Sequence, residues 1–242
     1  MLDGRWLGRV PYREAWRLQH DLVVRRAAGE IPDQLLLLEH EAVLTLGKQA
    51  DPAFVRATQD ELAQWGIELI RVERGGEVTY HGPGQLVAYP IVKLSDRGVM
   101  LRPFVRALEA AMSQTAEHFG VAAGRREGYP GCWCDPGGAR PRKLGALGLR
   151  VERGVTYHGI ALNVTTQLSD FELIEACGIP GVTITSIGRE AGWNGKRAQP
   201  STQSVAESAV VFATTFEQAL QDIAERALDR PTERDLVGTG AT

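Results

Sequence analysis

The run from Arg71 to Gln85, RVERGGEVTYHGPGQ, places four glycines and a histidine between two apolar segments. The flanking segments Ile67–Ile70 and Leu86–Val92 are typical of strands, so this run connects strand to strand. A phosphate-binding loop or a dinucleotide fingerprint needs its glycines between a strand and the start of a helix. The run therefore argues against both motifs. It predicts either a backbone that comes close to another group, without a Cβ in the way, or an elaborate hairpin turn.

Helices and strands are predicted on both sides of this run. Apolar residues recur at helical spacing from Tyr12 to Ala27 and from Leu101 to Gly120. Thr58 and Glu61 have the spacing of a capping box, which predicts a short helix before Gly66. The remaining predictions are strands at 34–39, 42–47, 143–151, 155–164 and 182–187, turns over 121–141, a helical turn at 171–176, and one or two helices over 201–229.

The chain of 242 residues is long enough for one well-buried domain, which we expect over residues 1–230, with a disordered tail over 231–242. A net charge of −3 argues against nucleic-acid binding driven by overall charge. The sequence contains no apolar run of membrane-spanning length and no signal peptide at its start. The three cysteines have no disulfide-framework spacing, so we expect a reduced, cytoplasmic protein.

Part of the glycine-rich run is repeated later in the chain, with two residues missing. RVERGGEVTYHG ends at Gly82, and RVERGVTYHG ends at Gly159. One interpretation is that His81 and His158 face a common pocket, and the other is two similar edge hairpins. These histidines and His40 are too scattered for a metal motif, and each is expected to form hydrogen bonds near a pocket. Cys132 and Cys134 lack the second ligand pair that zinc needs, so no metal is predicted.

Cys177 is the cysteine with a candidate chemical role. It follows a short predicted helical turn and precedes Gly-Ile-Pro-Gly, whose backbone N–H groups are expected to be free to face an oxyanion. A thiol at its reference pKa of about 8.5 is only a few per cent thiolate at pH 7, so catalysis needs a nearby base or cation. The alternative is an inert buried cysteine.

Lys143 is the candidate partner of that thiol. It begins the otherwise apolar, glycine-rich strand KLGALGLR. A lysine in such surroundings has a depressed pKa and acts as a base. The alternative is an exposed cation at the end of the preceding Pro-Arg-Lys turn.

Four motifs appear in order along the chain: RGGEVTYHGPGQLVAYP, KLGALGLR, HGIALNV and ACGIPGVTITSIG. Together they closely resemble the lipoyl(octanoyl) transferases, and LLLLEHEAVLTLG near the start matches as well. The similarity runs from about Leu7 to Ala219. The chain departs from the family pattern at Glu41-Ala42, at Ala176 and at Gly145, and PGGARP before Lys143 resembles a modest insertion.

The resemblance implies a mixed α/β fold of one domain, with a mostly antiparallel sheet flanked by helices, as in the biotin and lipoate protein ligases of the class II synthetase-like type. It implies that Cys177 and Lys143 form a catalytic dyad, with no cofactor and no metal. Further residues are implied to line the acyl site: Arg74, Gly75, Gly76, Glu77, Val78, Thr79, Tyr80, His81, Ala146, Leu147, Gly148, Gly159, Ile160 and Ala161.

The implied reaction moves an octanoyl group from octanoyl-acyl carrier protein, through a cysteine thioester, to a lysine of a lipoyl domain. The implied acceptors are the lipoyl domains of 2-oxoacid dehydrogenases and the H protein of glycine cleavage. Acyl carrier proteins are acidic, so Arg125, Arg126, Arg140 and Arg142 are candidate docking residues or a merely solvated basic loop. An ATP-dependent lipoate or biotin ligase and a non-catalytic acyl- or carrier-binding module remain as alternatives.

Overall fold

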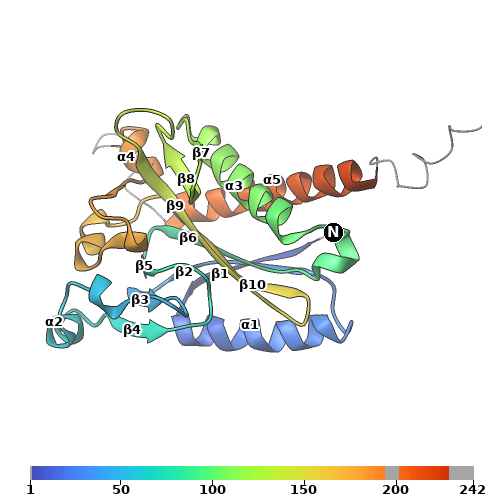
Figure 1. Cartoon of the computed structure of the whole chain (residues 1–242), viewed down its shortest axis with the longest axis horizontal. Helices are drawn as coiled ribbons and strands as arrows, with labels where there is room; N and C mark the ends of the chain where they lie inside the picture. Colours follow the sequence, from blue (N-terminus) through green and yellow to red (C-terminus); the bar gives the residue numbers. More distant parts are fainter. Residues whose placement is uncertain (1, 194–201, 229–242) are drawn as a thin grey trace, which may run out of the picture.

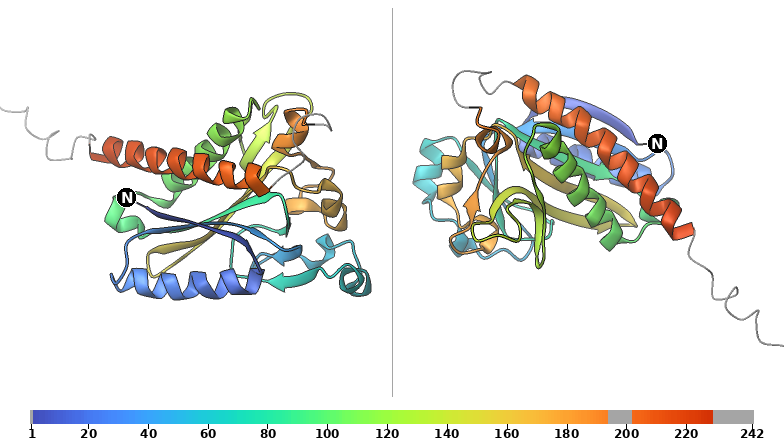
Figure 2. Two further views of the ribbon diagram at one scale, coloured as in Figure 1. Left: turned by 180° about the vertical axis from the view of Figure 1, so that it is seen from behind. Right: turned by 90° about the horizontal axis from the view of Figure 1, so that it is seen from above.

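The computed structural model describes residues 2–193 and 202–228 as three layers around one large sheet (Figure 1). Helix α1 (Tyr12–Ala27) covers one face of the sheet, and α3 (Leu101–His118) and α5 (Thr202–Leu228) cover the other. Figure 2 shows α3 and α5 side by side across that second face. None of the helices in the described residues has the length and hydropathy that a bilayer span requires.

The large sheet has the strand order β1-β2-β6-β10-β9-β8-β7, and β11 adds to β9. These strands are β1 (Asp3–Val10), β2 (Gln34–His40), β6 (Gln85–Ile91), β7 (Gly124–Arg126), β8 (Tyr129–Cys134), β9 (Arg142–Glu152), β10 (Val155–Asn163) and β11 (Thr183–Ile184). Among the described strand pairs of this sheet, β1/β2 and β9/β11 are parallel and the others are antiparallel. The mixed, mostly antiparallel sheet predicted from the resemblance is confirmed.

A small second sheet has the order β4-β3-β5 and lies beside the large one. Its strands are β3 (Val43–Leu46), β4 (Glu68–Arg71) and β5 (Val78–His81). The remaining helices are α2 (Gln59–Gln64) and α4 (Ile187–Glu190), with 3-10 turns at Pro52–Phe54, Leu94–Arg97, Leu168–Leu173 and Ala176–Gly178. The capping box predicted for α2 is present, with Thr58 as its N-cap and Glu61 reaching back to it.

Strand β2 illustrates why the fold has three layers. Successive side chains of a strand point to opposite faces, and all seven residues of β2 are buried. Leu35 and Leu37 pack in the core under α3 and α5, whereas Leu36 and Leu38 pack in the core under α1. A strand covered on both faces reads as a continuous apolar run, which is why QLLLLE carries no alternation.

The structure corrects the predicted elements in three places. Strand β1 was not predicted, because its exposed and charged residues do not form an apolar pattern at the sheet edge. The glycine-rich run is not a simple connection, because Val78–His81 forms β5 and pairs with β3. The segment 121–141 is not all turn, because it contains the β7–β8 hairpin.

The later elements are closer to expectation. The predicted helical turn at 171–176 is the 3-10 turn Leu168–Leu173, and the predicted strand at 182–187 is only Thr183–Ile184. One helix, α5, occupies the predicted helical region at the C-terminal side. The predicted tail over 231–242 lies outside the described residues, so it stays a prediction, as does the single domain over residues 1–230.

Candidate active site

A cavity of about 540 Å³ opens where β9 leaves one of its edges without a neighbouring strand. β8 pairs with β9 only from Arg142 to Gly145, whereas β10 accompanies β9 much further, to Glu152. The free edge beyond Gly145 faces the segment Arg74–Glu77, here called the glycine strap. This cavity is called the active-site cavity below.

Nearly all of the sequence-predicted site residues line this cavity. They are Arg74, Gly75, Gly76, Glu77, Val78, Thr79, His81, Lys143, Ala146, Leu147, Gly148, His158, Gly159, Ile160, Ala161 and Cys177. His81 and His158 face one cavity, so the interpretation of the echoed motif as parts of one pocket is confirmed. Tyr80 and His40 are not among the lining residues.

Glycines allow the strap to lie directly against β9. The Gly75 N–H donates to the Leu149 carbonyl at 3.0 Å. A Cβ at Gly148 would lie 2.7 Å from the Gly75 carbonyl oxygen, closer than such atoms approach. The close backbone approach predicted for the glycine-rich run therefore occurs, and it forms one wall of the cavity.

Lys143 and Cys177 both line the cavity. Both also line a small void of about 10 Å³ beside it, together with Thr79, Ala146 and Ala161. Lys143 is only 5% exposed, and its Nζ donates to the Pro130 carbonyl at 3.2 Å. The interpretation of Lys143 as an exposed cation is wrong, because the β8–β9 ladder places its side chain inside.

Cys177 has an unusual backbone conformation for a residue with a Cβ. Its φ of 59° and ψ of 16° are left-handed, and Gly178 follows with a φ of 62°. A Cβ at Gly178 would lie 2.8 Å from Glu77 Cγ, so the turn packs against the glycine strap. Non-glycine residues adopt this conformation only where the surrounding structure imposes it, and such residues cluster at functional sites. The Cys177 side chain is half-buried, so it is not an inert core thiol.

The expectation of free amides after Cys177 is wrong for two of them. The Gly178 N–H donates to the Glu175 carbonyl at 3.0 Å, and the Ile179 N–H donates to the Ala176 carbonyl at 3.2 Å. Pro180 has no N–H. The Gly178 and Ile179 amides are therefore used within the turn and are not free to face an oxyanion.

The turn is part of a loop, Leu168–Val182, here called the nucleophile loop, which is held on two sides. The Glu175 N–H donates to the Phe54 carbonyl at 2.7 Å, and Val55 forms a β-bridge with Ile174. On the other side, the Tyr80 hydroxyl donates to Asp170 Oδ2 at 2.6 Å. Tyr80 therefore supports the loop from β5 instead of lining the cavity.

Replacing Tyr80 by phenylalanine is expected to lower stability by about 1 to 2 kcal/mol, because the Asp170 carboxylate loses a hydrogen bond. We expect the melting temperature to fall and the reactivity of the Cys177 thiol to change. Asp170→Ala combined with Tyr80→Phe should cost less than the two single changes added together. Strict additivity would show that the two side chains do not act as a pair.

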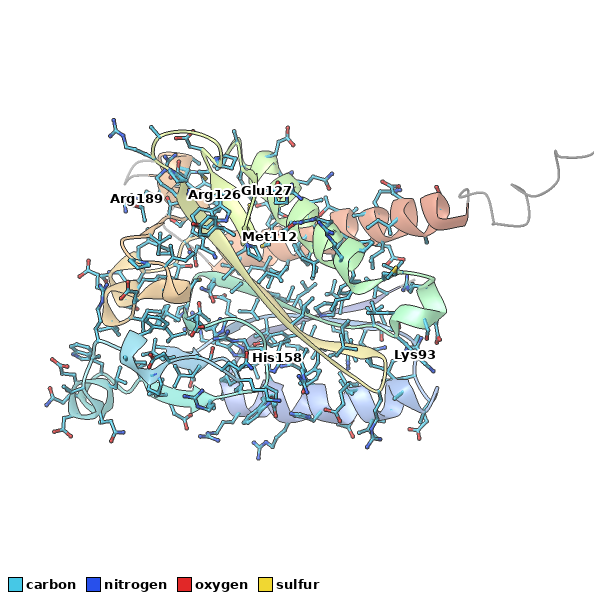
Figure 3. The ribbon with its side chains drawn as sticks, in the orientation of Figure 1. Lys93, Met112, Arg126, Glu127, His158 and Arg189 are labelled. Atoms are coloured by element: carbon cyan, nitrogen blue, oxygen red, sulfur yellow. The ribbon has the colours of Figure 1, made fainter. Side chains whose placement is uncertain are left out.

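The cavity wall contains both apolar and polar side chains. An apolar part is formed by Leu101, Val105, Leu147, Leu149 and Ile160. A polar part is formed by Tyr12, Arg74, His81, Tyr89 and His158. Figure 3 places His158 between the large sheet and α1.

The polar side chains of this wall are uncharged, apart from Arg74. Burial lowers the pKa of His81 well below its ordinary value, and it also lowers the pKa of His158. Burial raises the pKa of Tyr12 to about 12 and that of Tyr89 well above its ordinary value. His40 lies behind this wall, where its Nε2 is 2.8 Å from the Tyr89 hydroxyl, and burial lowers its pKa to about 4.

A buried chain of hydrogen bonds orients His81. Asn163 Nδ2 donates to the Thr185 carbonyl, which leaves its Oδ1 to accept from Gln85 Nε2 at 2.9 Å. The Gln85 oxygen therefore faces His81 Nδ1 at 2.8 Å and accepts its proton. His81 Nε2 keeps its lone pair on the side of Thr45, 3.5 Å from that hydroxyl.

Several residues of the cavity carry no signal in the sequence. Tyr12 and Leu101 each begin a helix, and Tyr89 lies in an apolar strand, so nothing in their neighbourhood marks them. Gln85, which orients His81, lies inside the glycine-rich run, and that run already pointed to its position near the site. Cys132 and Cys134 are free thiols buried in the core, and no group of three or more possible metal ligands occurs among the described residues.

Solved structures that superpose on this chain identify its fold. A solved bipartite lipoate protein ligase from Thermoplasma acidophilum superposes with a TM-score of 0.60 at 15% identity, over 100% of this chain and 99% of that one. A biotin protein ligase from Aquifex aeolicus, in complex with biotin and ATP, gives 0.53 at 13% identity, over 97% and 77%. The fold is therefore that of the lipoate and biotin protein ligases, and Cys177 and Lys143 are among the residues that line its cavity.

Comparison with related sequences identifies the family within this fold. Residues 11–213 match the family described as lipoyl protein ligase A/B catalytic domain. The octanoyltransferase of Chloroflexus aurantiacus is 43% identical over 88% of this chain and 94% of its own. That of Corynebacterium efficiens is 45% identical over 84% and 77%. The chain belongs to the octanoyltransferase family of enzymes.

Proposed function

We propose that this protein transfers an octanoyl group from octanoyl-acyl carrier protein to a lysine of a lipoyl domain, through a thioester on Cys177. The observation that carries the proposal is that Cys177 and Lys143 line one cavity with a continuous apolar wall. Family membership supports the octanoyl group. The proposed acceptors are the lipoyl domains of 2-oxoacid dehydrogenases and the H protein of glycine cleavage.

In the first half-reaction, the Cys177 thiolate attacks the thioester carbonyl of the carrier. A bond forms between sulfur and the acyl carbon, and the bond to the carrier sulfur breaks. The departing thiolate takes a proton from the Lys143 ammonium, which becomes a neutral amine. Gly76 N–H lies on the cavity wall and has no hydrogen-bond partner among the described residues, so it is our candidate oxyanion donor.

In the second half-reaction, the neutral amine of the acceptor lysine attacks the octanoyl thioester. Its nitrogen loses a proton to the Lys143 amine, and the Cys177 thiolate leaves. The products are an amide and the enzyme in its starting protonation state. A thioester is converted to an amide without ATP, by covalent catalysis with two successive substrates.

The apolar wall supplies the affinity for the acyl chain. At about 0.8 kcal/mol per buried CH₂ group, an eight-carbon chain contributes roughly 5 kcal/mol. Leu147, Leu149 and Ile160 on β9 and β10, with Leu101 and Val105 of α3, form this wall.

The docking surface for the acidic carrier is proposed at the rim near β7 and β8. The Arg126 guanidinium lies 4.8 Å over the Tyr129 ring, and Tyr129 lines the cavity. Arg142 is paired with Glu190 at 2.7 Å, and Arg125 with Glu127 at 3.1 Å. Of the four arginines considered, Arg126 and Arg140 are therefore better placed to meet an acidic partner.

Intact mass spectrometry tests the proposed function. After incubation with octanoyl-acyl carrier protein, the protein is expected to gain the mass of one octanoyl group. Cys177→Ala should gain nothing, and Cys134→Ala should behave as the unchanged protein, because Cys134 is a buried thiol outside the cavity. Absence of the adduct in the unchanged protein, under conditions where the acceptor is modified, would exclude the thioester route.

The fold favours one alternative, an ATP-dependent ligase, because solved lipoate and biotin ligases share it. That activity does not need a nucleophilic cysteine. It would modify a lipoyl domain from free octanoate and ATP, and Cys177→Ala would retain it. The octanoyltransferase requires neither free octanoate nor ATP. Retention of function in Cys177→Ala without any acyl transfer would instead indicate a binding module.

A further inference from the structure

Arg74 is a buried cation in the active-site cavity without a carboxylate partner. It is 7% exposed. Its side-chain hydrogen bonds all end on uncharged oxygens, those of Thr45 and the Gly75 carbonyl, at 2.7 to 3.3 Å. None of the ion pairs found within residues 2–193 and 202–228 includes it. A buried charge is usually paired, so this exception calls for a partner that the resting polypeptide does not supply.

The proposed reaction requires such a partner twice. Cys177 carries a negative charge before it attacks the carrier, and again when it leaves the acyl group. Lys143 alone cannot remain the stabilising cation throughout, because it gives up its proton in the first half-reaction and takes one back in the second. A guanidinium stays protonated at every stage, since its pKa is far above the working range.

We propose that Arg74 is the permanent positive charge beside which the Cys177 thiolate forms, while Lys143 exchanges protons. This inference rests on the proposed function, because it assigns the thiolate to that reaction. Arg74 and Cys177 line the same cavity, and the strap that carries Arg74 packs against the turn that carries Cys177. Arg74 makes no contact with the substrate in this assignment, so it is a positioning residue for charge.

The other ionisable groups around the cavity do not take this role. His81 on β5 and His158 on β10 are neutral, and Tyr12 on α1 and Tyr89 on β6 keep their protons. Tyr129 on β8 cannot supply a positive charge, because a phenol is either neutral or anionic. Glu77 on the strap lines the cavity with a negative charge, which opposes a thiolate, and Glu175 on the nucleophile loop is partly paired with Arg56 at 3.8 Å. Among the described residues that line the cavity, Arg74 and Lys143 are therefore the two candidates for a positive charge.

The neighbours of Arg74 hold its charge in place. Two of its nitrogens donate to the Thr45 hydroxyl oxygen, so the Thr45 hydrogen is left to donate toward His81 Nε2. Burial lowers the pKa of Arg74, and the anionic forms of four groups near it, those of Tyr12, Cys177, Tyr89 and Glu77, act in the opposite direction. The guanidinium is therefore fixed next to a histidine that does not compete for the thiolate as a cation.

The test measures the pKa of the Cys177 thiol from the rate of iodoacetamide alkylation between pH 5 and pH 10, by intact mass. Arg74→Gln keeps a donor for the Thr45 carbonyl but removes the charge. It is expected to raise the thiol pKa by about one unit, so alkylation at low pH slows about tenfold. Arg74→Lys should stay close to the unchanged protein. Arg74→Met supplies a second uncharged variant should the glutamine form be unstable.

Arg71→Met is the matched control. Arg71 also donates only to carbonyl oxygens, those of Gly47, Lys48 and Ala50, but it does not line the cavity. Its removal should leave the thiol pKa unchanged. Cys177→Ala measures the background alkylation of the other two cysteines. We expect this background to be low, because burial raises the pKa of Cys132 to about 12 and that of Cys134 to about 11.

The results separate the inference from the function on which it rests. An unchanged thiol pKa in folded Arg74→Gln or Arg74→Met overturns the role of Arg74, even if the unchanged protein forms the octanoyl thioester. A shift of the same size in Arg71→Met also overturns it, because the effect would then come from net charge. If no octanoyl thioester forms while the Arg74 shift is present, the proposed function fails and the charge assignment stands.

Discussion

Replacing Lys143 by methionine is expected to lower kcat/KM for octanoyl transfer by about 10³-fold, a typical loss for a positioned acid and base. Methionine preserves the apolar stem of the side chain but can neither protonate the departing carrier thiolate nor accept the proton of the incoming amine. The rate of octanoyl-enzyme formation, followed by intact mass, and the rate of lipoyl-domain modification should both fall.

Lys143→Arg distinguishes the two roles of this lysine. Arginine keeps a positive charge but does not release its proton in proteins. We expect the thiol to remain reactive toward iodoacetamide while transfer to the acceptor stays slow. Lys93→Met is the matched control, because Lys93 is also partly buried but lies by Asp96, outside the cavity (Figure 3). Full activity in Lys143→Met would remove Lys143 from the mechanism.

Replacing Gly159 by alanine is expected to lower the free energy of unfolding by about 3 kcal/mol, because of overpacking between two paired strands. A Cβ at this position would lie 2.0 Å from the Ala88 carbonyl oxygen of β6 and 2.8 Å from Pro90 Cδ. Backbone atoms cannot rotate away as a flexible side chain can. Urea denaturation, followed by far-UV circular dichroism, measures the change.

Gly4→Ala provides the comparison for Gly159→Ala. Gly4 also lies in a strand of the large sheet, but an added Cβ there would meet no atom within 4 Å. Its unfolding free energy should change by no more than about 0.5 kcal/mol. If the two variants lose equal stability, the loss reflects strand glycines in general and not the contact between β10 and β6.

The residue patterns identified the framework of the fold and most of the candidate site. Apolar periodicity found α1 and α3, and an uninterrupted apolar run found β2, because these elements bury large side chains. The ordered motifs identified the family, and with it Cys177 and Lys143. The same patterns missed β1, because an exposed edge strand needs no apolar face.

Other features depend on contacts between distant segments, which no local pattern records. Tyr80 and His81 are neighbours in one motif, yet the alternation of β5 sends Tyr80 to Asp170 and His81 to the cavity. The Gly178 and Ile179 amides were expected to be free, but the turn itself uses them.

Residue type and order were enough to predict the family, the mixed α/β fold and the candidate nucleophile and base. Which groups share a cavity, and which of them carry charge, follows from the folded structure. Burial and hydrogen-bond partners set the protonation of His81, His158 and Tyr89, and they leave Arg74 a buried cation without a carboxylate. These properties arise from the surroundings of each side chain, which exist only once the chain has folded.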